Sequence, residues 1–322
     1  YGIVAQTAQS RVEIIDSTIT RNEYGILTLD GAHVTRKFSK VLGNKKLEFH
    51  TKPADDPPLQ LPNYKPEPGK NPREVDDEVL ARDTIWDGYV IVNGRVRVPT
   101  ESRLVIMPGT VVEFRKKDTN GDGIGENGLM LQGVLIAKGT PEKPIIFRSA
   151  EKVGRKGDWD AINIINSDGV RNVIEYCQIE DAYRGLHFHF SNVVIQRTIF
   201  RNNYRGVQFQ ESTVELRDNT FYANHSAIQA RDSEIVFLRN QVLGNVFGAN
   251  FLRAHLNIQD NRFGNNLDFG LKVREGYPTV SNNVFHHNRF GLMFSDMAYG
   301  LTSRNLILHN GESGLSIRTG AN

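Results

Sequence analysis

The 322-residue chain has little of several features that would narrow its class. It holds one cysteine, so no internal disulfide can form. No apolar run reaches the roughly 18 residues that a membrane-spanning helix needs. Thirty-nine basic residues oppose 37 acidic ones, and the net charge of +2 gives no global attraction to nucleic acid or to an anionic membrane. We therefore expect no nucleic-acid partner and no membrane span in this chain.

The sequence also has no signal-peptide pattern at its start. Its first and last residues both fall in the middle of repeat units, which predicts that the chain is part of a longer polypeptide. The single cysteine, Cys177, lies in a strand-like stretch at 173–178. We expect Cys177 to fill space in a core rather than to act as a reactive thiol.

A repeat of 21 to 23 residues organises most of the sequence. Each unit carries a glycine followed by apolar residues, at Gly185, Gly206, Ala227 (in place of glycine), Gly248, Gly270, Gly291 and Gly314. Units this short, with alternating apolar residues and no helical period, predict short strands. The expected fold class is all-β: a right-handed parallel β-helix solenoid with coils of about 21–23 residues and three short strands per coil.

Asparagines recur at two places in the unit. One set precedes the glycine and includes Asn203, Asn224, Asn245 and Asn288; the other comprises Asn219, Asn240, Asn261, Asn283 and Asn305. In a parallel stack, equivalent residues lie roughly 4.8 Å apart, so the amides can bond to one another along the stack. We predict an architectural role for them.

The repeat divides the chain into three parts. Residues 1–49 match the template and form coils of the same or of a preceding helix, which the sequence leaves open. Residues 50–83 hold seven of the twelve prolines among charged residues, which indicates an excursion or linker. Residues 84–322 form the main β-helix, with a loop inserted at 118–126.

The segment 84–318 resembles the bacterial right-handed β-helix repeat proteins of the pectate-lyase-like superfold. The resemblance rests on Trp86-x-Gly88, Pro108-Gly109-Thr110-Val111-Val112-x-Phe114, Gly133-x-Leu135-x-Ala137-x-Gly139-Thr140 and Pro144-Ile145-x-Phe147-x-Ser149. That group includes polysaccharide lyases, hydrolases and epimerases, periplasmic copper-accessory proteins, and surface proteins without known activity. The resemblance implies the fold and leaves the function open.

The inserted loop places oxygen-bearing side chains at alternate positions, with glycine at position six. Asp118, Asn120, Asp122 and Glu126 offer side-chain oxygens and Ile124 a backbone carbonyl. This pattern resembles a calcium loop without the closing glutamate at position twelve. We expect structural calcium here, the alternative being a metal-free polar hairpin. A weak calcium site fits a secreted, cell-surface or periplasmic location.

The strand after each glycine should point alternate residues outward. The outward columns supply the candidate binding residues His187, His189, Gln208, Gln210, Gln229, Arg231, Lys272, Arg274 and Arg318. Amide and guanidinium groups suit the hydroxyls and carboxylates of an acidic polysaccharide. The expected function is an extracytoplasmic surface module, structural or binding an acidic glycan or another surface protein along this face. Inward residues of the same strands, Phe188, Phe209, Val273, Phe294 and Ile317, should form the core.

A catalytic alternative uses the same face. Lys272 and Arg274 could serve a polysaccharide lyase, and Glu211 and Asp232, stacked at the strand ends, could form the acid/base pair of a hydrolase. Nearby arginines favour an ion-pair ladder instead. We assign no catalytic residue, since the signature motifs of polygalacturonases and alginate epimerases are missing.

Overall fold

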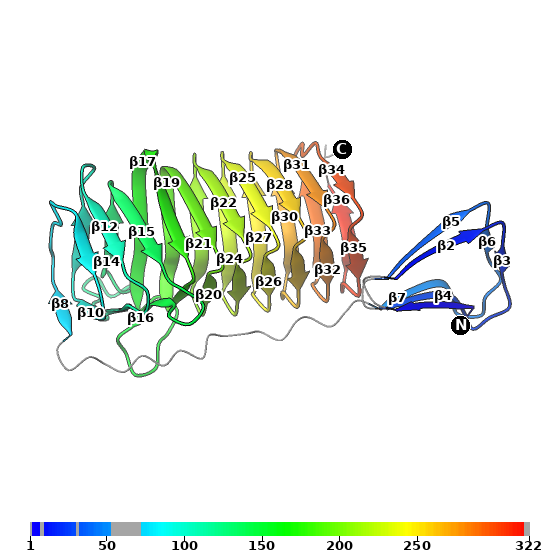
Figure 1. Cartoon of the computed structure of the whole chain (residues 1–322), viewed down its shortest axis with the longest axis horizontal. Helices are drawn as coiled ribbons and strands as arrows, with labels where there is room; N and C mark the ends of the chain where they lie inside the picture. The colour runs from blue at the N-terminus through cyan, green and yellow to red at the C-terminus, as the bar shows by residue number, and fades with distance from the viewer. Residues whose placement is uncertain (1, 7–9, 30–31, 53–71, 319–322) are drawn as a thin grey trace. The chain divides into compact units, whose positions relative to one another are not determined.

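The computed structural model describes residues 2–6, 10–29, 32–52 and 72–318 (Figure 1). Every regular element of these residues is a β-strand. The chain divides into two compact units, residues 1–60 and 61–322. No helix of the described residues could span a membrane. The all-β solenoid expected from the repeat is confirmed.

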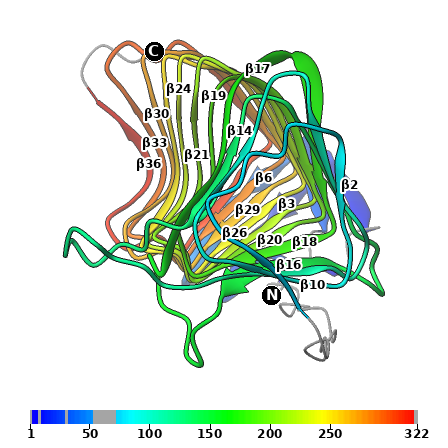
Figure 2. The ribbon, with the colours of Figure 1, turned by 90° about the vertical axis from the view of Figure 1, so that its left-hand side faces the viewer.

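The larger unit is built from three rows of parallel strands, which form the walls seen end-on in Figure 2. We call the row that follows the repeat glycines the glycine row. It contains β11 (Arg95–Val98), β14 (Gly128–Leu131), the first part of β17 (Trp159–Glu175) and of β19 (Ala182–Gln196), β21 (Arg205–Gln210), β24 (Ser226–Arg231), β27 (Phe247–Leu252), β30 (Phe269–Arg274), β33 (Phe290–Ser295) and β36 (Ser313–Ile317).

The second row continues each coil in the same 18-stranded sheet. It comprises β9 (Thr84–Trp86), β12 (Arg103–Ile106), β15 (Val134–Lys138), the later parts of β17 and β19, β22 (Thr213–Arg217), β25 (Glu234–Leu238), β28 (His255–Gln259), β31 (Tyr277–Ser281) and β34 (Leu301–Ser303).

The third row forms a separate 11-stranded sheet. It comprises β8 (Arg73–Val75), β10 (Tyr89–Val92), β13 (Val111–Phe114), β16 (Ile145–Ser149), β18 (Cys177–Glu180), β20 (Ile199–Arg201), β23 (Thr220–Tyr222), β26 (Gln241–Leu243), β29 (Arg262–Gly264), β32 (Val284–His286) and β35 (Leu306–Leu308). The regular part of the stack therefore has three short strands in each coil, as the sequence predicted.

The larger unit begins before residue 84, where the sequence placed the boundary. β8 pairs with β10, and Leu80 is buried in the core, so residues from 73 onward belong to the stack. Strand β8 is short and precedes an irregular stretch, so its sequence does not show the pattern of the repeat and could not be assigned to the stack in advance. Most of the proline-rich stretch, residues 53–71, lies outside the described residues.

Stacked aromatic rings fill much of the interior. Phe188 lies over Phe209 with ring centroids 4.7 Å apart, and Phe200 lies over Phe221 at 4.9 Å. Phe188, Phe209, Val273 and Phe294 are buried as expected. Ile317 is not: it is 59% exposed, because β36 pairs only with β33 among the described strands.

The asparagine ladders are confirmed. Asn224 is typical: its Nδ2 donates to Phe200 O at 2.9 Å and to Asn245 Oδ1 at 3.0 Å, while its Oδ1 accepts from the backbone N of Asn203 at 3.0 Å. Each amide thereby satisfies backbone groups of buried turns, which would otherwise lack partners. The residue before it, Ala223, adopts a left-handed conformation with φ of 54°. Between residues 190 and 287, one residue of this kind turns the chain at each corner.

The smaller unit follows the same template. Its strands are β1 (Ile3–Gln6), β4 (Tyr24–Leu29) and β7 (Leu47–Lys52) in one sheet, β2 (Arg11–Ile15) with β5 (His33–Lys37), and β3 (Thr18–Ile19) with β6 (Lys40–Val41). Asn22 and Asn44 bond as the ladder asparagines do. Ile14, Ile19, Ile26 and Val41 form its core.

Candidate functional site

The predicted outward columns of the glycine row are in register. Gln208, Gln229, Asn250 and Lys272 lie beside one another in successive strands, and so do Gln210, Arg231, Leu252 and Arg274. All of them except Lys272 border a groove of about 150 Å³, and Lys272 lies beside it, next to Asn250 in the register. We call it the amide groove; its lining is Gln208, Phe209, Gln210, Gln229, Ala230, Arg231, Asn250, Leu252 and Arg274. The groove lining contains no carboxylate.

Two cations of this face lack acidic partners. Within the part of the chain that the structure describes, no ion pair involves Lys272 or Arg274, and the buried Arg274 Nε has no hydrogen-bond partner. Arg231 donates to Gln210 Oε1 at 2.6 Å and lies 3.8 Å from Asp232. Arginines elsewhere in the unit make close pairs; Arg239, for example, lies 2.7 Å from Asp218. The groove therefore carries uncompensated positive charge.

The histidines lie in the coil next to the groove, beside Gln208 and Gln210. Asn163 Nδ2 donates to Leu129 O at 3.3 Å, so its Oδ1 faces His187 Nδ1 at 2.8 Å and accepts that proton. His187 Nε2 is then the acceptor for His189 Nε2, 2.8 Å away. Burial, reinforced by Arg184, lowers the pKa of His187 to about 3. The pair is neutral and adds no charge to the groove.

One member of the predicted acid pair at the strand ends, Asp232, is held in an ion pair with Arg253 of the following coil. Asp232 accepts two bonds from the Arg253 guanidinium, at 2.7 and 3.0 Å. These bonds hold the pKa of Asp232 below its usual range, opposite to what a proton donor needs. Glu211 and Asp232 both border a shallow hollow with Arg253. The contacts favour the ion-pair ladder at this corner.

A second groove, which the sequence did not indicate, lies against the third row. It measures about 660 Å³, and we call it the loop groove. Its lining is Tyr89, Glu113, Arg148, Ser149, Ala150, Glu151, Lys152, Gly154, Glu180, Asp181, Arg201, Asn202, Tyr222 and Ala223. The charged residues pair internally: Arg148 lies 2.8 Å from Glu113, and Arg201 lies 2.6 Å from Glu180.

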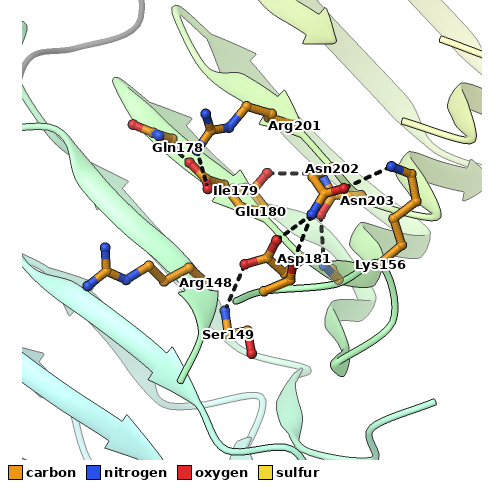
Figure 3. A network of polar contacts seen from close by, with 12 residues as sticks. Arg148, Ser149, Lys156, Gln178, Ile179, Glu180, Asp181, Arg201, Asn202 and Asn203 are labelled. Carbon is orange, nitrogen blue, oxygen red and sulfur yellow. Dashed lines mark hydrogen bonds and ion pairs between the residues drawn. The ribbon is translucent and has the colours of Figure 1, made fainter. Parts of the chain in front are cut away.

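Asp181 joins the loop groove to the loop at 150–158. Its carboxylate accepts from Asn202 Nδ2 at 2.7 Å and from Ser149 N at 3.4 Å. Asn202 in turn accepts from Lys156 Nζ at 2.8 Å and donates to Gly154 O at 3.3 Å (Figure 3). Burial raises the pKa of Asp181 to about 6. No repeat position marks Asp181 in the sequence, since its partners come from an insertion and from the next coil.

The oxygen-rich loop folds back on its own backbone. Asp118 accepts from Gly121 N and Gly123 N, at 2.8 and 2.9 Å. Asp122 accepts from Ile124 N at 2.8 Å, and Asn120 Oδ1 from Asp122 N at 3.0 Å. Glu126 accepts from the Thr119 hydroxyl at 2.5 Å. Among the described residues no three acidic, histidine or cysteine side chains converge as metal ligands, so calcium stays a prediction.

Comparison with known proteins agrees with this architecture. The family model described as a right-handed β-helix region matches residues 151–276 and 248–322, together more than half of the chain. A search of curated proteins found no match. The matched segment contains the glycine-row coils from β19 to β36 and the whole amide groove. The chain belongs to the right-handed β-helix family.

Proposed function

We propose that the larger unit is a non-catalytic binding module that holds an extended acidic glycan along the amide groove. The observation that carries the proposal is the unpaired charge of Arg274 in a lining without carboxylates, with the unpaired Lys272 on the same strand beside it. An uncompensated guanidinium favours an anionic ligand and bonds carboxylate or sulfate oxygens in a planar, two-point geometry. The neighbouring amides both donate to and accept from sugar hydroxyls.

The larger loop groove is a weaker candidate for the same role. Its volume exceeds that of the amide groove, but Glu113, Arg148, Glu180 and Arg201 are already engaged in ion pairs. A ligand there would have to replace these pairs and bear the desolvation of the groups it frees. Its unpaired charge therefore makes the amide groove the better candidate for binding an acidic glycan, although the loop groove is larger.

Binding can be tested by isothermal titration calorimetry with a panel of acidic and neutral polysaccharides. Acidic chains should bind, and Arg274→Gln should weaken binding about tenfold, since one charge-assisted hydrogen bond is lost. Lys138→Gln is a matched control, because Lys138 is an exposed cation at the end of β15, away from the groove. Equal losses in both variants would count against a specific groove.

The catalytic alternative is a polysaccharide lyase or hydrolase in the same groove. Two free cations on one coil, Lys272 and Arg274, would suit a lyase that removes a proton beside a uronate. Incubation with acidic polysaccharides, followed by measurement of unsaturated-uronate absorbance and of reducing ends, separates binding from turnover. Turnover that Lys272→Ala or Glu211→Ala abolishes would refute the non-catalytic proposal.

We also propose that the module works outside the cytoplasm, as a secreted, cell-surface or periplasmic protein. Extended acidic glycans are polymers of cell surfaces and their surroundings, and the module's ligand would be met there. A weak calcium site at 118–126 would be occupied only where calcium is abundant. Detection of the protein in a cytoplasmic fraction alone would contradict this location.

A further inference from the structure

The cations of the outward column that contains Arg231 and Arg274 recur in every second coil. Arg231 lies beside Leu252, Leu252 beside Arg274, and Arg274 beside Ser295. The register continues to Arg318, whose backbone N donates to Phe294 O at 2.9 Å. The column thus reads arginine, leucine, arginine, serine, arginine.

The neighbouring column adds one cation in the same phase. Lys272 shares its coil with Arg274, whereas the equivalent residues are Asn250 and Met293 in the adjacent coils and Gln229 in the coil of Arg231. The coil before Arg231 presents only glutamines in the two columns, Gln208 and Gln210. Charge in the groove is therefore a property of alternate coils.

Other arginines of these coils lie outside the two columns and have partners of their own. Arg184 lies 2.7 Å from Asp160, and Arg253 lies 2.7 Å from Asp232. Arg205 donates to Gln208 Oε1 at 2.5 Å, and its guanidinium lies over the rings of Tyr183 and Tyr204. It is held at the start of β21 by these contacts. The alternation therefore belongs to the two columns that face the ligand.

This spacing selects among acidic glycans. Adjacent coils lie about 4.8 Å apart, so the arginines recur about every 10 Å. An extended ligand that lies along the row with each sugar spanning one coil would meet a cation at every second sugar.

Resting on the proposed function, we propose that the amide groove recognises a glycan in which charged and uncharged sugars alternate, with one anionic group per disaccharide. Arg231 and Arg274 bind the anionic groups. Leu252, between them, faces the uncharged sugar. A homopolymer with a carboxylate on every sugar would place a charge against Leu252, where it loses water without gaining a cation.

The test compares two wild-type affinities. Oligosaccharides of hyaluronan, with one carboxylate per disaccharide, and oligogalacturonates of the same number of sugars are titrated into the whole chain. Hyaluronan should bind about tenfold more tightly although it carries half the charge. Equal or tighter binding of the galacturonate would overturn the alternation but leave an acidic-glycan site standing. Failure of every acidic chain to bind would instead remove the proposed function.

A gain-of-function variant tests the register itself. Leu252→Arg fills the gap in the arginine column and should raise galacturonate affinity about tenfold while leaving hyaluronan affinity unchanged or lower. Leu238→Arg, on β25 in the second row, is the matched control and should change neither. Equal gains for both ligands in the Leu252 variant would contradict the alternation. Should that variant not fold, the wild-type comparison decides alone.

Discussion

Phe209 shows how a single side chain supports the stack. It is 2% exposed and lies flat against Phe188. Phe209→Ala removes a large buried ring and leaves a cavity, so we expect the free energy of unfolding to fall by about 3–5 kcal/mol. Denaturant titration of the two proteins measures the difference.

Phe190→Ala is the comparison for this prediction. Phe190 lies in the neighbouring strand β19 but is 47% exposed, and its loss should cost less than about 1 kcal/mol. Similar losses for Phe190 and Phe209 would show that the assignment of inward and outward residues is wrong.

Asp181 makes stability depend on pH. Because burial raises its pKa to about 6 in the folded state, the folded protein binds the proton more tightly than the unfolded chain does. The contribution of Asp181 to the free energy of unfolding should then fall as pH rises from about 4 to about 6, by as much as about 3 kcal/mol. Above that range this contribution should stay constant.

Asp181→Asn removes this titration. Unfolding curves of the wild type and the variant at several pH values isolate the contribution of Asp181, because other carboxylates titrate in both proteins. A constant difference between the two proteins from pH 4 to 7 would show that Asp181 is not shielded from water.

At the scale of residues, sequence reasoning worked where a side chain's surroundings repeat. The columns through Gln208 and Arg231 follow from strand alternation and from a constant coil length. Asp181 could not be found in this way, since its burial depends on the loop at 150–158 and on Asn202. Ile317 was misplaced because alternation gives the direction of a side chain but not what covers it.

At the scale of elements, the asparagine ladders were the most predictable feature. Each asparagine amide makes the same hydrogen bonds to the next coil. Asparagines one repeat apart in the sequence are therefore predicted to contact each other in the structure. The strand β8 was not predictable, because three residues after a proline-rich stretch show no periodicity. The loop groove was missed for a similar reason, as an insertion has no equivalent in other coils.

The loop at 118–126 offers a test of metal binding. Calcium that binds only the folded state should raise the melting temperature, and a chelator should lower it, more than magnesium does. Asp118→Ala should remove the response, because Asp118 supplies the first oxygen of the loop. The same experiment on Asp168→Ala is a control, since Asp168 is an exposed aspartate outside the loop.

A melting temperature that ignores both calcium and chelator would leave the loop as a polar hairpin. Its internal bonds from Asp118 and Asp122 to backbone N–H groups already account for its shape without a metal. The argument from calcium for an extracytoplasmic location would then fail as well.

At the scale of the larger unit, each coil contacts mainly its two neighbours, so stability is a sum of local terms. Cys177, 2% exposed in β18, reports on the opening of these coils. Burial raises the pKa of its thiol, which suppresses the reactive thiolate. We expect native protein to resist alkylation at pH 8 and denatured protein to react at once; rapid labelling of native protein would contradict a closed core.

The single left-handed residue at each corner has a consequence for how such a chain can lengthen. Because Glu211, Asp232 and Arg253 turn equivalent corners in the same way, a coil can be copied within a gene and still stack on its neighbours. Copying one coil would shift every later arginine of the amide groove out of phase. Copying two keeps the phase, so a lineage that retained the proposed alternating ligand would grow by pairs of coils.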